Sequence, residues 1–204
     1  MDVKINKMEQ SKYKNIRSQQ NLYFFENLKE ILNTIKPHRI IEIGTSRGAT
    51  TLYMSDLLVE LGLTDSKIKS FDIIEKEHLK NLNIDNLEFY IGNIFQYNKN
   101  NLSKPEEIVD FLSKDGVNLI LCDGGDKICE FRILSQYLKD GDIIMAHDYS
   151  PDEETFNNEY KDKIWNWMEI TDKDIQETVE QYNLQPYNME LIKPTAWVAK
   201  IKRG

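Results

Sequence analysis

Residues that could bind a ligand or accept a proton follow several short apolar segments of this 204-residue chain. Residues 42–48 have the sequence EIGTSRG, in which Gly44 and Gly48 permit a tight turn and a close approach of the backbone to a ligand. Asp72, Asn93 and Asp123 follow the next apolar segments in turn. If these segments are parallel strands, their carboxyl ends share one edge of a sheet, and ligands bind there.

The glycine motif differs from the fingerprint of dinucleotide-binding proteins. That fingerprint is G-x-G-x-x-G, and Ser46 stands at its second glycine position here. A helix that starts after the turn would supply free N–H groups and the positive end of its dipole. The motif therefore favours a ligand with a sugar and a carboxylate over a pyrophosphate. Taken alone, it also fits a purely structural turn.

Two further positions suit a nucleoside. Asp72 could accept hydrogen bonds from the two hydroxyls of a ribose, although a solvated carboxylate at a strand end is the alternative. Asn93 could bind the edge of an adenine, and Ile94 could cover its face.

The hydrophobic pattern predicts strands that alternate with helices. Five strands are expected at residues 39–43, 69–74, 87–91, 117–121 and 142–146. Helices are expected after Gly48, at 75–81, from 103 to 116 and at 127–138. Connections of ten or more residues make these strands parallel. A loop at 149–163, one or two helices at 164–181 and strands at 189–192 and 196–201 complete the pattern.

An apolar stripe at helical spacing also predicts a helix over residues 19–35. Its residues Gln20, Tyr23 and Phe24 would either cover a cofactor or form a dimer contact. We expect residues 1–35 to be an N-terminal helical extension. Residues 36–204 would be a single domain with a helical insertion at about 150–182.

Composition excludes several classes of protein. Lys and Arg number 26 against 34 Asp and Glu, which gives a net charge of −8 and argues against a nucleic-acid partner. The candidate basic stripe is N-terminal and consists of Lys4, Lys7, Lys12, Lys14 and Arg17. Cys122 and Cys129 are too few for a disulfide framework and fit buried apolar positions. Without a visible signal or spanning segment, we expect a cytoplasmic protein with no membrane partner.

In this order, the motif at 42–48, Asp72, Asn93 and Asp123 resemble the class I S-adenosylmethionine (SAM)-dependent methyltransferases over residues 36–202. The resemblance implies an α/β fold with a doubly wound, Rossmann-like sheet of seven strands, mostly parallel with one antiparallel strand. It also implies SAM as cofactor. The residues that would bind it are Glu42, Gly44, Thr45, Ser46, Gly48, Asp72, Ile73, Asn93, Ile94 and Asp123.

Residues 117–127 and 138–149 are similar to the cephalosporin-hydroxylase-like and macrolide or sugar O-methyltransferases. This resemblance implies a divalent cation, Mg²⁺ or Mn²⁺, held by Asp123, Asp148 and His147. Such a cation stabilises the alkoxide of the acceptor. The position three residues after Asp123 implies Asp126 as general base, with Lys127 and His147 as the other candidates. A third metal ligand is the alternative role of Asp126.

Together these features predict methyl transfer from SAM to a hydroxyl of a small molecule or sugar. Asp123 is followed by two glycines rather than by the Pro-Pro-aromatic signature of N-methyltransferases, which disfavours methylation of a base. A non-catalytic SAM- or nucleotide-binding module is the alternative, and a nicotinamide oxidoreductase is a third class. Trp165 and Trp167 are more consistent with packing than with a pocket wall. The identity of the acceptor and the oligomeric state, including a homo-oligomer, stay open.

Overall fold

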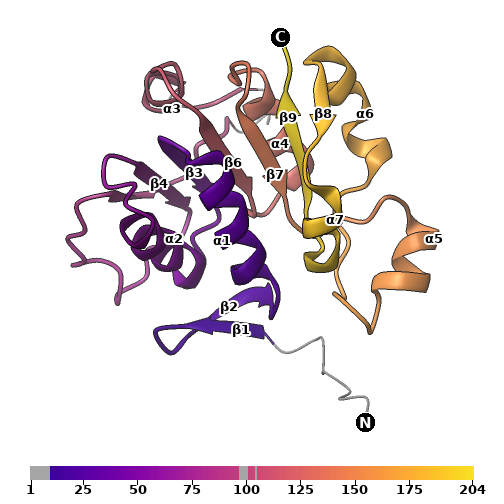
Figure 1. Cartoon of the computed structure of the whole chain (residues 1–204), viewed down its shortest axis with the longest axis horizontal. Helices are drawn as coiled ribbons and strands as arrows, with labels where there is room; N and C mark the ends of the chain where they lie inside the picture. Colours follow the sequence, from indigo (N-terminus) through magenta and orange to yellow (C-terminus); the bar gives the residue numbers. More distant parts are fainter. Residues whose placement is uncertain (1–9, 97–100, 104) are drawn as a thin grey trace.

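The structure, a computed structural model, describes residues 10–96, 101–103 and 105–204. Seven strands form one sheet in the order β5-β4-β3-β6-β7-β9-β8 (Figure 1). Their bounds are β3 Arg39–Ile43, β4 Lys67–Asp72, β5 Leu87–Ile91, β6 Asn118–Cys122, β7 Ile143–Ala146, β8 Leu184–Pro186 and β9 Val198–Lys202. The pairs among β3 to β7 are parallel, and β9 runs antiparallel to both neighbours. The predicted fold class is confirmed.

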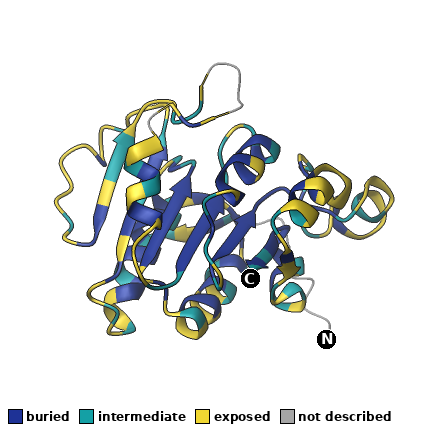
Figure 2. Ribbon diagram, turned by 90° about the horizontal axis from the view of Figure 1, so that it is seen from above, coloured by how far each residue is buried: buried dark blue, intermediate teal, exposed yellow. Residues whose placement is uncertain are grey.

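Helices cover both faces of this sheet and bury it. On one face lie α1 (Phe24–Ile35), α2 (Ala49–Glu60) and the short α7 (Met189–Ile192). On the other lie α3 (Pro105–Leu112), α4 (Lys127–Ser135) and α6 (Asp172–Gln181). Every residue of β3, β6 and β7 is buried, so the central strands form the dark band in Figure 2. Continuous apolar strands are expected where helices cover both faces.

The N-terminal segment corrects the predicted helical extension. Residues 10–21 form a hairpin of β1 (Gln10–Tyr13) and β2 (Ile16–Asn21), and helix α1 begins only at Phe24. Lys14 and Asn15 both have positive φ, as a two-residue hairpin turn requires. The apolar stripe belongs to α1, and the residues before it form a strand that is polar after Ile16. Residues 1–9, with Lys4 and Lys7, lie outside the described part.

Four other segments differ from the prediction. Residues 75–81 contain turns instead of a helix, and 164–171 are irregular before α6. The expected loop at 149–163 contains α5 (Glu153–Thr155) and a π-helical turn (Phe156–Tyr160). Residues 189–192 are helix α7, which packs on α1, and the penultimate strand is β8. Proline at the end of β8 is tolerated because this strand lies at the sheet edge.

No helix in the described ranges is long and apolar enough to cross a lipid bilayer.

A buried polar network joins the amino ends of the central strands. Asp142, which is fully buried, accepts hydrogen bonds from the backbone and side-chain amides of Asn118, both at 2.8 Å. It also accepts one from the backbone N–H of Lys139 at 2.9 Å. Asn118 in turn accepts a bond of 2.8 Å from Arg39 Nε. The network fixes the amino ends of β3, β6 and β7 and leaves their carboxyl ends to form a site.

Removing the Asp142 carboxylate should leave several buried donors without an acceptor. We expect Asp142→Ala to lower the free energy of unfolding by about 3 kcal/mol, measured by urea denaturation. The matched control is Glu177→Ala, an exposed position on α6, where the change should stay within about 0.5 kcal/mol. A loss at Asp142 no larger than that of the control would contradict the role of the network.

Candidate functional site

A cavity of about 490 Å³ opens at the carboxyl ends of β3, β4, β5 and β6. We call it the larger cavity. It is the edge at which ligands bind in open α/β sheets. Its lining includes Gln19, Gly44, Ser46, Asp72, Ile73, Ile74, Lys76, Asn93, Ile94, Asp123, Gly124, Asp126 and Glu130.

The glycine turn after β3 brings the loops of β3 and β6 into contact. Gly44 has a φ of +94°, and a Cβ there would lie 2.2 Å from the carbonyl oxygen of Asp123. Only glycine permits that approach. The backbone N–H of Ser46 donates to Asp72 Oδ2 at 2.7 Å, and that of Ile74 donates to Oδ1 at 2.8 Å. These bonds hold the Asp72 carboxylate at the cavity wall.

Seven of the ten residues predicted to bind the cofactor line this cavity: Gly44, Ser46, Asp72, Ile73, Asn93, Ile94 and Asp123. The other three are Glu42, Thr45 and Gly48. They do not line the cavity, and their contacts stabilise the turn after β3. Thr45 shares a hydrogen bond with Ser70, and Gly48 precedes α2 where a side chain would collide with Leu79.

Glu42 lies inside the fold, behind the turn after β3. Its side chain is buried and accepts hydrogen bonds from the hydroxyls of Thr51 and Ser70, both at 2.5 Å. Burial raises the pKa of Glu42 to about 8, although both hydroxyls oppose the shift. Glu42 therefore belongs to the support of β3 and not to the wall of the cavity.

A smaller cavity of about 270 Å³ adjoins the first. Its lining is Gln10, Gln19, Asp123, Gly124, Lys127, His147, Asp148, Trp165, Trp167 and Glu169. Gln19, Asp123 and Gly124 line both cavities. The Asp123 carboxylate therefore lies at the boundary between two neighbouring binding spaces.

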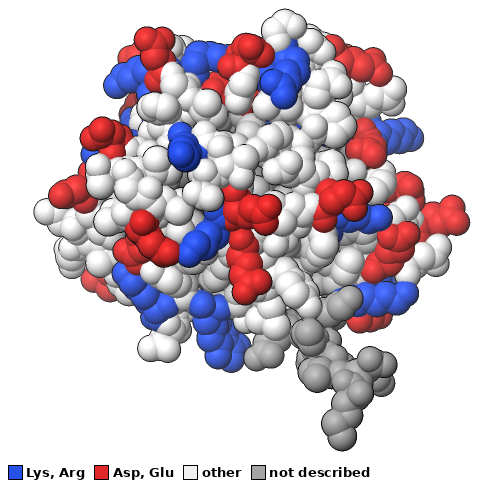
Figure 3. All heavy atoms as spheres, viewed as in Figure 1, with Lys and Arg blue, Asp and Glu red and all other residues white. Residues whose placement is uncertain are grey.

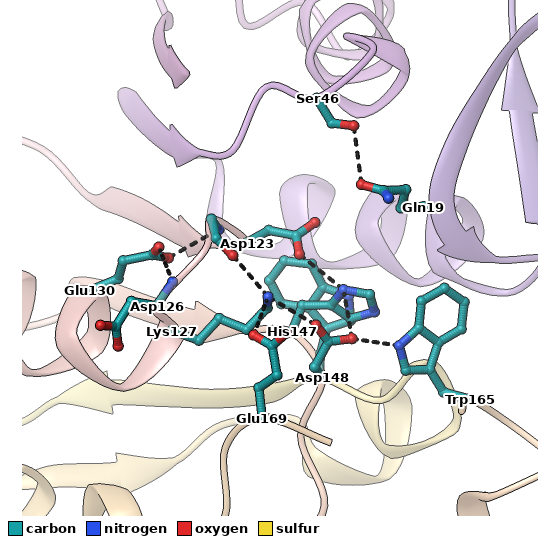
Figure 4. A network of polar contacts seen from close by, with 12 residues as sticks. Gln19, Ser46, Asp123, Asp126, Lys127, Glu130, His147, Asp148, Trp165 and Glu169 are labelled. Carbon is teal, nitrogen blue, oxygen red and sulfur yellow. Dashed lines mark hydrogen bonds and ion pairs between the residues drawn. The ribbon is translucent and has the colours of Figure 1, made fainter. Parts of the chain in front are cut away.

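A polar network surrounds this boundary (Figure 4). His147 Nδ1 lies 3.0 Å from Asp123 Oδ1 and 3.6 Å from Asp148 Oδ1. Lys127 Nζ lies 2.8 Å from Asp148 Oδ2 and 2.9 Å from Glu169 Oε2. Ligand atoms of Asp123, His147 and Asp148 lie within 4.8 Å of one another, so the three predicted metal ligands are brought together.

The family model of the FtsJ-like methyltransferases matches residues 11–202 of this chain. The chain belongs to that family. The class I SAM-dependent methyltransferase assignment made from the sequence is thereby confirmed.

Sequence relatives match part of this methyltransferase. The protein-L-isoaspartate O-methyltransferase of Shewanella loihica is 34% identical over 74 residues, which are 36% of this chain and 35% of the relative. The chain therefore aligns with about a third of the length of that curated relative.

Solved structures share the fold at low identity. CmcI in its apo form has a TM-score of 0.65 and 11% identity, covering 95% of this chain and 76% of CmcI. CmcI with Mg and SAM has a TM-score of 0.62 and 13% identity, covering 94% and 76%. MycE in complex with Mg, SAH and mycinamycin VI has a TM-score of 0.50 and 11% identity, covering 87% and 49%.

Lys127 lies inside the acidic cluster of the methyltransferase site. Its ammonium group is buried and also donates to the carbonyl of Gly124 at 2.9 Å. Burial alone would lower the pKa of Lys127, but Asp148, Asp123 and Glu169 raise it well above its usual value. Burial would likewise raise the pKa of Asp148, but His147, Lys127 and Trp165 lower it. Lys127 therefore stays charged and neutralises part of the acidic cluster.

Asp126 occupies the N-cap of α4, where Oδ1 accepts a hydrogen bond from the backbone N–H of Cys129 at 3.2 Å. It lines the larger cavity and does not join the group of Asp123, His147 and Asp148. Asp126 therefore lies outside the group of possible metal ligands, and its role as general base stays a prediction.

Glu130 is a site residue that the sequence did not reveal. It is buried beneath the loop after β6 and accepts hydrogen bonds from the backbone N–H groups of Gly124 and Asp126. Burial raises the pKa of Glu130 to about 7, against the effect of those two bonds. Glu130 lies four positions after Asp126, one turn into α4. The sequence did not single it out, because an acidic residue in a helix does not by itself indicate a functional site.

Trp165 packs in a buried cluster with Tyr160 and Ala196, as predicted, and both tryptophans also line the smaller cavity. Trp165 Nε1 donates to Asp148 Oδ1 at 2.5 Å, and its ring lies 5.0 Å from that of His147. Trp167 is exposed at the rim of the smaller cavity, 5.3 Å from Trp165 between ring centroids. Their irregular backbone lets both indoles face one cavity, which positions i and i+2 of a helix would not allow.

The raised pKa of Glu42 makes its effect on stability depend on pH. Below its ordinary pKa of 4.5 the group is protonated in both states, and its contribution is lost as pH rises towards 8 because only the unfolded chain ionises. Glu42→Gln does not titrate. Its free energy of unfolding relative to wild type should rise by about 3 kcal/mol between pH 5 and pH 7.5.

Urea denaturation at four pH values measures this difference, with the exposed Glu177→Gln as control. A difference that stays constant with pH would show that Glu42 is ionised in the folded protein throughout.

Proposed function

We propose that this chain transfers the methyl group of SAM to a hydroxyl of a small molecule or sugar, with a divalent cation at the acceptor. The observation that carries the proposal is the position of Asp123, whose side chain lines both cavities. A cofactor in the larger cavity and an acceptor in the smaller one would meet beside this carboxylate. Holding both reactants in line supplies much of the rate gain in such a reaction.

The larger cavity has the groups that a SAM molecule needs. Asp72 keeps unused lone pairs on both oxygens, which can accept bonds from the ribose hydroxyls. Asn93 Oδ1 accepts a hydrogen bond from the backbone N–H of Phe95 at 2.9 Å. This bond stabilises the loop after β5, where the adenine of SAM would bind. In this proposal Ile94 would cover the adenine, and Gly44 and Ser46 would face the methionine end.

The acidic cluster fits a divalent cation. Asp123, Asp148 and Glu169 carry three negative charges, and Lys127 carries one positive charge. The remaining two negative charges are what a divalent ion would neutralise. Asp123, Asp148 and His147 would hold it, through carboxylate oxygens that suit Mg²⁺ or Mn²⁺ and one imidazole nitrogen. CmcI and MycE, which share the fold, both have structures with Mg.

When bound, the cation would lower the cost of forming the acceptor alkoxide. We assign the acceptance of the proton to the oxygen of the Asp123 carboxylate that does not bind the cation. Lys127 holds its own proton and Asp126 caps a helix, whereas Asp123 faces the smaller cavity and is bonded to His147. The second nitrogen of His147, Nε2, is buried without a hydrogen-bond partner.

The smaller cavity favours a compact acceptor. Its two indoles and its acidic rim suit a ring that carries hydroxyl groups. MycE, which shares the fold, has a structure in complex with mycinamycin VI. On the face shown in Figure 3, basic and acidic side chains are interspersed, without the broad positive field that binds nucleic-acid phosphates.

Asp123 tests the cation and the transfer together. Asp123→Asn should weaken Mg²⁺ or Mn²⁺ binding, measured by calorimetry, by more than about 100-fold, because a negatively charged oxygen ligand is lost from the ligand set. Methyl transfer to a panel of hydroxylated rings should be lost. Affinity for S-adenosylhomocysteine should stay within about threefold. The control Asp115→Asn, at an exposed position before the amino end of β6, should change none of these properties. Equal loss of cation and cofactor binding would make Asp123 structural.

Asp72 tests the cofactor site. Asp72→Ala should weaken S-adenosylhomocysteine binding by about 1.5–3 kcal/mol, the scale of hydrogen bonds to a charged group. Glu77→Ala, exposed in the same loop, is the control and should leave the affinity unchanged. NADH should not bind. An unaltered affinity in Asp72→Ala would remove Asp72 from the ribose site, and NADH binding alone would favour an oxidoreductase.

A further inference from the structure

The hairpin residue Gln20 reaches the centre of the site from a distant part of the chain. It lies on β2 with 1% of its surface exposed, and its Nε2 donates to Asp123 Oδ2 at 2.7 Å. Its Oε1 accepts a hydrogen bond of 2.8 Å from Nε1 of Trp197, the residue that precedes β9. Three separate segments therefore meet at one amide.

The indole of Trp197 determines which way that amide points. An indole N–H can only donate, so the oxygen of Gln20 must face it and the NH₂ group must face Asp123. The reverse orientation would place two donors together at Trp197 and two acceptors together at Asp123. Trp197 is itself held by stacking on Phe24 and on His147, with ring centroids 5.0 Å and 4.9 Å away.

The contacts form a closed ring of four side chains: Gln20, Asp123, His147 and Trp197. Each oxygen of Asp123 receives one hydrogen bond, Oδ2 from Gln20 and Oδ1 from His147. The ammonium of Lys127 instead bonds Asp148, Glu169 and the carbonyl of Gly124. Gln20 thus orients the Asp123 carboxylate without neutralising its charge.

We propose that Gln20 is a positioning residue for Asp123, and that Trp197 sets its orientation. The proposal rests on the proposed function, in which Asp123 binds the cation and faces both substrates. It makes the β1–β2 hairpin part of the active site. Groups that orient a metal ligand typically contribute 10–100-fold to metal affinity.

Gln20→Met keeps the length of the side chain but removes both hydrogen bonds. It should weaken Mn²⁺ binding, measured by calorimetry with S-adenosylhomocysteine bound, by about 10–100-fold. Affinity for S-adenosylhomocysteine should stay within about threefold. Arg17→Met, exposed on the same strand, is the matched control and should change neither affinity. Trp197→Phe keeps the stacking but frees the amide to rotate, and should weaken Mn²⁺ binding by several-fold.

The double variant of Gln20→Met and Trp197→Phe completes a cycle. If Trp197 acts through Gln20, the double variant binds Mn²⁺ no more weakly than Gln20→Met alone. The proposal is overturned by additive effects, by Mn²⁺ affinity of Gln20→Met within twofold of wild type, or by an equal loss of cofactor affinity.

Metal-free crystal structures of wild type and Gln20→Met decide the geometry even if no cation binds the wild type. If no cation binds the wild type, the cation in the proposed function is refuted. If the Asp123 carboxylate has the same position in Gln20→Met as in the wild type, the role of Gln20 is refuted.

Discussion

The contact between the turn after β3 and the end of β6 is the constraint on which the rest of the site depends. Gly44 packs so closely against the backbone of Asp123 that no side chain fits between them. This contact brings a turn that can bind a cofactor beside a carboxylate that can act on an acceptor. Gly124 adds to it, because a Cβ there would lie 2.2 Å from Glu130 Oε1. The loops after β3 and β6 are thus in direct backbone contact.

The charges around this contact have separate tasks. Asp148 is paired with Lys127 and bonded to Trp165, so its charge is largely satisfied within the protein. Asp123 is bonded to an amide and an imidazole, which orient it but leave its charge available. A carboxylate kept in this state beside two cavities can attract the positive sulfonium of SAM or a divalent ion. The acidic residues that looked equivalent in sequence therefore differ in function because their neighbours differ.

The N-terminal hairpin links the site to the other face of the molecule. Tyr13 and Lys14 both bind Asp56 of α2, at 2.5 and 2.6 Å, and fix the hairpin beside that helix. At the opposite end of β2, Gln19 accepts a bond from the Ser46 hydroxyl at 3.1 Å, and Gln20 binds Asp123. A change in the turn after β3 would therefore alter the contacts of the hairpin and, through Gln20, those of the acidic cluster.

Local pattern was enough for the central sheet and for much of the cofactor cavity. Strands that are buried on both faces have continuous apolar sequences, and the carboxyl ends of parallel strands lie at one edge of the sheet. The sequence therefore predicted that Gly44, Asp72, Asn93 and Asp123 lie close together. His147 and Asp148 follow β7 directly, and the same rule located them.

What the pattern missed depends on contacts between distant segments. Glu42 turns towards Thr51 and Ser70 and away from the cavity, and no sequence spacing shows which face of a buried strand meets a ligand. Gln20 reaches Asp123 only because a hairpin lies where a helix was expected. Lys127 looked like a base until three acceptors were seen around its ammonium group. The sequence by itself determined which chemical groups are available, and the tertiary structure decided their charge and orientation, because both are set by neighbours remote in the chain.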